Sequence, residues 1–194
     1  MISSREVFLS IYGAYQFAKF KRNAVDYFEN TPKAFWRSFS SALIALPAYI
    51  LLVSQNFVER PVNVSGARIV IVESTAYVIG WVIFPLIMIS FTDTLNRFDR
   101  YYRFVAAWNW SIILQVLLFL SVTTLITTGI VPAQLAGFVS LIAIITILFY
   151  QGYIATMTLE IRASAALIVV SIDFVLALCL KILIQSFYTD YSGA

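Results

Sequence analysis

The chain contains no histidine and only one cysteine, Cys179. Without histidine it lacks the commonest metal ligand and the commonest general base at neutral pH. Zinc sites, haem sites and a serine–histidine mechanism are therefore effectively excluded, and no cofactor or metal is expected. A single cysteine cannot form an intrachain disulfide, and in an apolar run it is expected to be a small buried hydrophobe.

Charged residues are also scarce, at 12% of the 194 residues against 61% hydrophobic residues. A soluble globule needs more polar surface than this, and several apolar runs exceed the roughly 18 residues that identify a membrane span. The chain is therefore expected to be an integral membrane protein. Its net charge of +3 reflects topology, because the basic residues flank the spans, and no nucleic-acid partner is expected.

The apolar runs predict an all-α protein with five transmembrane helices and an N-terminal amphipathic interfacial helix. The predicted parts are an amphipathic segment at 1–36, a transmembrane domain at 37–188 with spans at about 38–58, 69–91, 104–126, 133–156 and 163–187, and a short outside tail at 189–194. The short uncharged turn at 127–132 predicts an antiparallel hairpin of the third and fourth spans. Gly137 and Gly152 are expected to permit close helix approach in the fourth span.

The N-terminal helix is predicted to carry an apolar stripe, with Arg5 and Gln16 off it. The stripe consists of Val7, Phe8, Ile11, Ala14, Tyr15 and Ala18. Such a helix either lies in the membrane interface or packs beneath the spans against their cytoplasmic ends, and the two positions are compatible. The cluster Lys19, Lys21 and Arg22 is expected to meet anionic headgroups, with a specific lipid pocket as the alternative.

Local signals also predict a helix start and interfacial anchors. Thr31 is a candidate cap with Pro32 at the first helical position, and Phe35 and Trp36 follow at headgroup level. A second aromatic group, at the beginning of the third span, predicts an aromatic belt. It consists of Tyr101, Tyr102, Trp108 and Trp110.

Basic residues are distributed unevenly between the two ends of the spans. Arg60, Arg68 and, by snorkelling, Lys181 fall on one side, and the other ten of the 13 basic residues fall on the opposite side. The positive-inside rule then makes the N-terminus cytoplasmic and the C-terminus external. The inner set includes Arg97, Arg100 and Arg103, which are expected to contact headgroups or a partner.

Asp173 is the only acidic residue well inside an apolar run. A carboxylate at that depth costs roughly 2.5–3.5 kcal/mol on insertion scales, so it should face protein or water and be protonated or hydrogen-bonded. Candidate donors are Asn109, Gln115 and Gln151. Asp173 either has this structural role or belongs to a proton or cation path. Ser111 and Gln115, four residues apart, should share one face of the third span.

Other charged residues lie at the ends of spans. Glu73, one turn into the second span, is expected to reach interfacial water. Glu160 and Arg162 lie between the fourth and fifth spans. They either stop a span from sliding through the membrane or form a docking pair for a partner.

Three segments carry a pattern of aromatic and small residues. They are Thr31-Pro32-Lys33-Ala34-Phe35, the group Phe98, Arg103 and Phe104, and the run Phe149-Tyr150-Gln151-Gly152-Tyr153 followed by Glu160 and Ala165-Ala166-Leu167-Ile168-Val169. With the five-span topology, they resemble the YIP family, the Ypt/Rab-interacting membrane proteins and their bacterial relatives. The resemblance implies a role in membrane organisation, protein association or trafficking. It does not imply Rab binding. The predicted location is a bacterial inner membrane.

Two classes of function are open. The first is a non-enzymatic membrane protein that acts by association, as a scaffold, accessory subunit or membrane-organising factor. Its partners would be anionic headgroups, further copies of itself or other membrane proteins. The alternative is an oligomeric small-solute or ion permease that uses Asp173. An enzyme is not expected, because serine and aspartate never occur in a recognisable catalytic spacing.

Overall fold

The computed structural model describes residues 2–59 and 64–189. Within these ranges the chain is helical and contains no strand. Five helical segments are long and apolar enough to cross a membrane: Pro32–Phe57, Gly66–Thr94, Phe98–Thr127, Ala133–Leu159 and Ala163–Tyr188. The predicted all-α class with five spans is confirmed. Arg60 and residues 190–194 of the predicted tail lie outside the described residues.

The described helices follow one another with short connections. They are α1 (Ser4–Ala18), the 3-10 helix η1 (Arg22–Tyr27), α2 (Pro32–Ser38), α3 (Ser40–Glu59), α4 (Gly66–Thr94), the 3-10 helix η2 (Phe98–Arg100), α5 (Tyr101–Thr127), α6 (Ala133–Leu159) and α7 (Ala163–Thr189). The last four predicted spans each lie within one helix. The first begins at the break between α2 and α3, which hydropathy alone does not reveal.

The start of α2 has the predicted chemistry. The Thr31 hydroxyl accepts a hydrogen bond from the Ala34 amide at 3.1 Å, and Pro32 is the first helical residue. Proline suits that position because its missing N–H would have no partner within the helix. At the end of α6, Glu160 adopts a left-handed conformation with φ 51°, which reverses the chain into α7.

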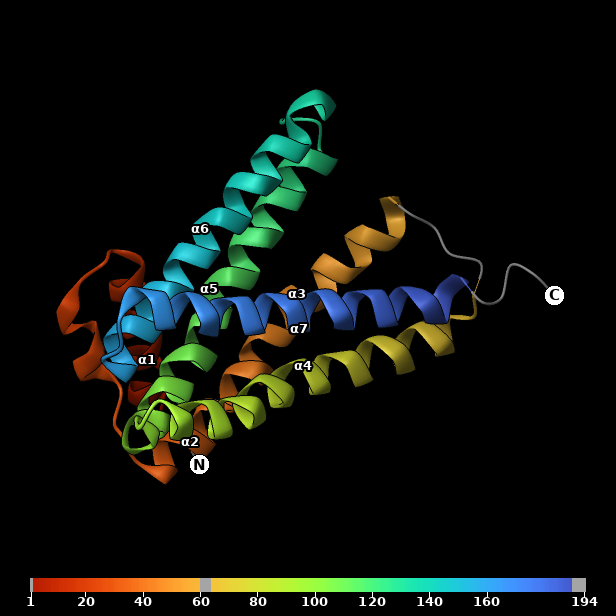
Figure 1. Cartoon of the computed structure of the whole chain (residues 1–194). Helices are drawn as coiled ribbons and strands as arrows, with labels where there is room; N and C mark the ends of the chain where they lie inside the picture. The colour runs from red at the N-terminus through yellow and green to blue at the C-terminus, as the bar shows by residue number, and fades with distance from the viewer. Residues whose placement is uncertain (1, 60–63, 190–194) are drawn as a thin grey trace.

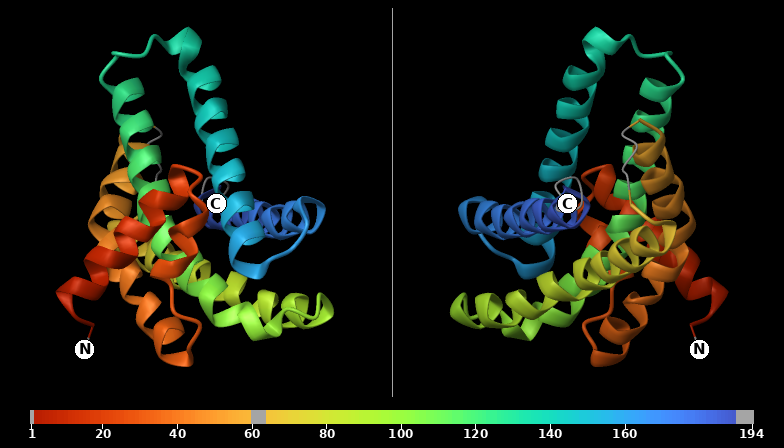
Figure 2. Two further views of the ribbon diagram at one scale, coloured as in Figure 1. Left: turned by 90° about the vertical axis from the view of Figure 1, so that its left-hand side faces the viewer. Right: turned by 90° about the vertical axis from the view of Figure 1, so that its right-hand side faces the viewer.

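The helices converge at one end of the molecule and spread apart at the other (Figure 1). The converging end, called the basal end below, contains α1, η1, α2, η2 and the loop at 160–162. From it the α5–α6 hairpin rises in one direction, while α4 and α7 run side by side in another (Figures 1 and 2). The predicted hairpin of the third and fourth spans is confirmed. Because α7 follows α4, it diverges from α6 away from the basal end.

α5 is the central helix, and it contacts α1, α2, α3, α4 and α6. Its first half is buried without interruption from Phe104 to Ser111. α7 instead lies at an edge, against α4 and α6, and has the smallest buried share of the five spans. The predicted burial of Cys179 is wrong: this residue is exposed, because it lies on the outer side of α7.

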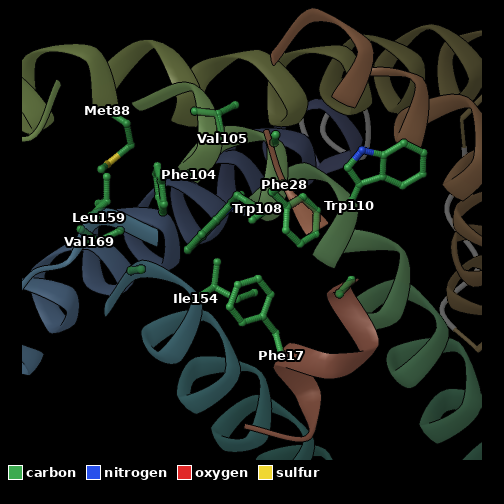
Figure 3. Packing of buried hydrophobic residues seen from close by; sticks show 14 of the residues in the cluster. Phe17, Phe28, Met88, Phe104, Val105, Trp108, Trp110, Ile154, Leu159 and Val169 are labelled. Carbon is green, nitrogen blue, oxygen red and sulfur yellow. The ribbon is translucent and has the colours of Figure 1, made fainter. Parts of the chain in front are cut away.

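The hydrophobic core lies at the basal end (Figure 3). The Trp108 ring lies 4.4 Å from that of Phe84 and 5.3 Å from that of Phe104, measured between centroids. Trp108 is 2% exposed and Trp110 is 3% exposed. The predicted aromatic belt is therefore wrong for both tryptophans and for Tyr101, which is 3% exposed and donates its hydroxyl to the Pro85 carbonyl at 2.9 Å. These three residues belong to the core because α1 and α2 pack over the beginning of α5.

α1 packs against η1, α5 and α6. Ala14 and Phe17 have no exposed surface, and the Tyr150 hydroxyl on α6 donates to the Ala14 carbonyl at 2.9 Å. The sequence predicts that α1 lies in the membrane interface, packs against the ends of the spans, or both. The structure shows the packing against the ends of α5 and α6. The predicted stripe is wrong in part, since Phe8, Tyr15 and Ala18 are exposed and Gln16 is buried. The buried face of α1 consists of Ser10, Gly13, Ala14, Gln16 and Phe17, and it is therefore rotated away from the predicted stripe.

Candidate functional site

Four polar side chains form a hydrogen-bonded ladder across α5, α6 and α7: Ser111, Gln115, Gln151 and Asp173. The Gln115 amide Nε2 donates to Ser111 Oγ at 3.0 Å. Gln151 Nε2 donates to Gln115 Oε1 at 3.2 Å and to Asp173 Oδ2 at 2.9 Å. The shared face of Ser111 and Gln115 is confirmed, and so is the contact of Asp173 with a donor on a neighbouring span.

The ladder is shielded from the surroundings of the bundle. Ser111, Gln115 and Gln151 are buried, and Asp173 is half-buried with its carboxylate directed at α6. Polar groups left without partners in hydrocarbon are costly, so the two bonds donated by Gln151 favour the close packing of α6 against α5 and α7. The bond from Gln115 to Ser111 lies within α5. The ladder thus joins the α5–α6 hairpin to α7 near the point where they begin to diverge.

The hydrogen bonds of the ladder suit the linking of helices better than the transfer of protons. Gln151 has two amide N–H donors. It donates one hydrogen bond to Gln115 and the other to Asp173. The Ser111 hydroxyl donates to the Trp108 carbonyl at 2.7 Å, so the chain of bonds ends on backbone. Asp173 is the one member of the ladder with an ionisable side chain. A single carboxyl group does not make a proton relay.

Asn109 does not belong to the ladder, so its predicted contact with Asp173 is wrong. Its Nδ2 donates to Ser38 Oγ at 2.9 Å, and the residue is 1% exposed. Ser38 ends α2, so this bond ties α5 to the break before α3. Asn109 and Ser111 are two residues apart and therefore point to different sides of α5.

A second polar cluster, absent from the sequence prediction, joins α3, α4 and α7. Glu73 Oε2 accepts a hydrogen bond from the Tyr49 hydroxyl at 3.0 Å, and Glu73 Oε1 accepts one from the Tyr188 hydroxyl at 2.8 Å. Glu73 is thus held by two phenols, where the sequence suggested interfacial water. Tyrosines in apolar runs were the only signal, and they do not identify a partner on another span.

Lys19, Lys21 and Arg22, expected to meet anionic headgroups, are exposed where the chain passes from α1 to η1. Lys19 Nζ lies 4.3 Å from the centroid of the Tyr15 ring. All three side chains can therefore reach a charged ligand beside the basal end. Their contact with lipid stays a prediction.

Arg97, Arg100 and Arg103, the other expected headgroup contacts, are half-buried. The Arg100 guanidinium pairs with Glu160, which connects the α4–α5 and α6–α7 loops. Arg100 is therefore engaged inside the protein rather than free for a headgroup. Glu160 is bound to Arg100 and not to Arg162, and the docking of this loop to a partner stays a prediction.

Among residues 2–59 and 64–189, no group of three or more cysteine, aspartate or glutamate side chains is placed to hold a metal ion. Comparison of the chain with family models, with curated proteins and with solved structures finds no match. Its function is therefore inferred from the arrangement of its own side chains.

Proposed function

We propose that the chain is a non-enzymatic integral membrane protein that acts by association, as a scaffold, accessory subunit or membrane-organising factor. The observation that carries this proposal is that polar side chains inside the spans form hydrogen bonds between helices. Such bonds occur in the ladder and in the Glu73 cluster. Groups used in this way stabilise a bundle, whereas a transport path needs polar groups that can exchange partners.

The outward faces of the spans support the same proposal. Large apolar side chains point away from the bundle on several helices, among them Leu43, Phe138 and Ile182. In a membrane such faces meet lipid or other spans, and close packing is what drives association there. The partners proposed are further copies of the chain or other membrane proteins. The resemblance to the YIP family implies the same kind of role.

We also propose a bacterial inner membrane, with the basal end in the cytoplasm. Ten of the 13 basic residues lie in elements of the basal end or next to them. α6 has 27 residues and is about 40 Å long, against a hydrocarbon core of about 30 Å, so α1 can pack beside the remaining ~10 Å. Trypsin should then cleave after Lys21 or Arg22 in sealed inside-out vesicles only. Cleavage only in right-side-out vesicles would reverse this orientation.

The experiment that tests association is purification from the native membrane in polymer-bounded lipid particles, followed by mass spectrometry of the accompanying proteins. We expect a stoichiometric membrane-protein partner or a discrete homo-oligomer. Asp173→Asn should retain this complex, because asparagine keeps an oxygen that can accept from Gln151. A solitary chain with a proteoliposome flux that Asp173→Asn abolishes would overturn the proposal in favour of the permease.

A further inference from the structure

A groove of about 730 Å³ lies between α6 and α7. This volume falls within the range of about 300–1,000 Å³ typical of ligand sites. The walls are almost entirely hydrocarbon, and the principal residues are Phe20, Phe149, Tyr153, Leu167, Val170 and Phe174. The groove exists because α7 follows α4 while α6 follows α5, which separates the two helices beyond the basal end (Figure 1).

The segment after α1 closes one side of the groove. The Phe20 ring lies 5.1 Å from the Tyr153 ring between centroids, and the Tyr153 hydroxyl donates to the Phe20 carbonyl at 2.8 Å. Phe20 has φ 55°, a left-handed conformation that turns the chain out of α1 at this point. The basic residues around Phe20 are thereby held beside α6.

Four basic side chains lie at the basal end of this groove. They are Lys19, Lys21, Arg22 and Arg162, all exposed. The first three adjoin Phe20 in the chain, and Arg162 precedes Ala163, which lines the groove together with Phe20. None of the four has an ion pair with another described residue. The nearest acidic residues in the chain are Asp26 and Glu160, and Glu160 is already paired with Arg100.

An apolar groove with four cations at one end favours a lipid over a second copy of the chain as the occupant. A symmetric dimer through this groove would bring the same four cations of each subunit toward one another, because a two-fold interface uses the same patch twice. An anionic phospholipid has the complementary pattern, with an apolar chain attached to a negative phosphate. The amino end of α7 adds the positive end of its helix dipole at the same place.

We propose that the groove between α6 and α7 binds one anionic phospholipid. An acyl chain lies against Tyr153, Val170 and Phe174, and the phosphate is held by Lys21, Arg22 and Arg162. This site goes beyond the proposed function and rests on it for the membrane setting, with the basal end in the cytoplasm. It would give the protein a preference for membrane regions rich in anionic lipid.

The test measures binding of fluorescent phosphatidylglycerol and phosphatidylcholine to the full chain in neutral-lipid nanodiscs. Each basic residue near an anionic surface changes affinity by about fivefold, so Lys21→Ala/Arg22→Ala should weaken phosphatidylglycerol binding by about 25-fold. Arg5→Ala/Lys33→Ala is the matched control, since it removes one arginine and one lysine that are also exposed at the basal end. The control should change binding less than twofold.

A second variant addresses the acyl chain. A Cβ at Gly152 would meet only Val170 Cγ2, at 3.8 Å, so Gly152→Leu can extend its side chain into the groove. It should reduce binding of the whole lipid at least tenfold, while soluble glycerol phosphate should not compete for the site. Equal binding of the two lipids, or equal losses from both charge variants, would overturn the proposal. Co-purification of protein partners, measured on the same variants, reports separately on the proposed function.

Discussion

Replacing Trp108 with alanine is expected to lower the free energy of unfolding by about 3–5 kcal/mol. Trp108 is 2% exposed, and its ring packs against Phe84 of α4 and Phe104 of α5. Alanine would leave a cavity where these helices meet. Close-packed surroundings relax only partly around such a cavity, so the lost contacts are not replaced.

The matched control is Trp36→Ala, because Trp36 on α2 is 72% exposed. Its removal should change the free energy of unfolding by less than about 0.5 kcal/mol. Denaturant titration in mixed micelles, followed by far-UV circular dichroism, measures both variants without relying on tryptophan fluorescence. Similar values for the two would show that the basal core does not contain Trp108.

Replacing Gly13 with alanine is expected to loosen α1 from the bundle. A Cβ at this position would stand 2.6 Å from Tyr27 Cβ and 2.8 Å from Phe28 Cε2. Rotation of the side chain does not move Tyr27 Cβ, so α1 and η1 must separate. Overpacking costs about 1–3 kcal/mol, against about 1 kcal/mol that alanine gains over glycine in a helix. The detached population should rise by up to about 30-fold.

Trypsin cleavage after Lys19 and Lys21, in sealed inside-out vesicles, measures this detachment. Gly137→Ala is the matched control, because Gly137 is also helical and a Cβ there meets nothing within 4 Å. The close helix approach predicted at Gly137 is therefore wrong. The control should be cleaved at the wild-type rate. Equal rates for Gly13→Ala and wild type would contradict the tight contact between α1 and η1.

Hydropathy predicts the existence of the spans well but not which of their faces are buried. Lipid is as apolar as a protein core, so a tryptophan at a span end can face either one. Trp108 and Trp110 fit an interfacial belt by position, yet the packing of α1 and α2 over α5 places them in the core. That packing depends on contacts between distant parts of the chain, such as the bond from Tyr150 to Ala14.

The contacts of polar residues inside the spans can be predicted in part, for an energetic reason. A carboxyl group in hydrocarbon needs a partner, so a donor for Asp173 could be sought among the few polar span residues. Gln151 was one of three candidates and is the donor. Asn109 was also a candidate, but its partner is Ser38. Residue type indicates that a partner exists, while the choice of partner depends on helix rotation.

The claim that polar side chains in the spans join helices is tested most directly by a double-mutant cycle of Gln151→Leu and Asp173→Leu, measured as free energies of unfolding in mixed micelles. We predict a coupling of about 0.6–1.7 kcal/mol, with Asp173→Asn nearly neutral for both folding and the native complex. A coupling of zero would contradict the claim. So would an Asp173→Asn protein that folds normally but loses its complex, because exchange of the Asp173 proton would then be the better explanation.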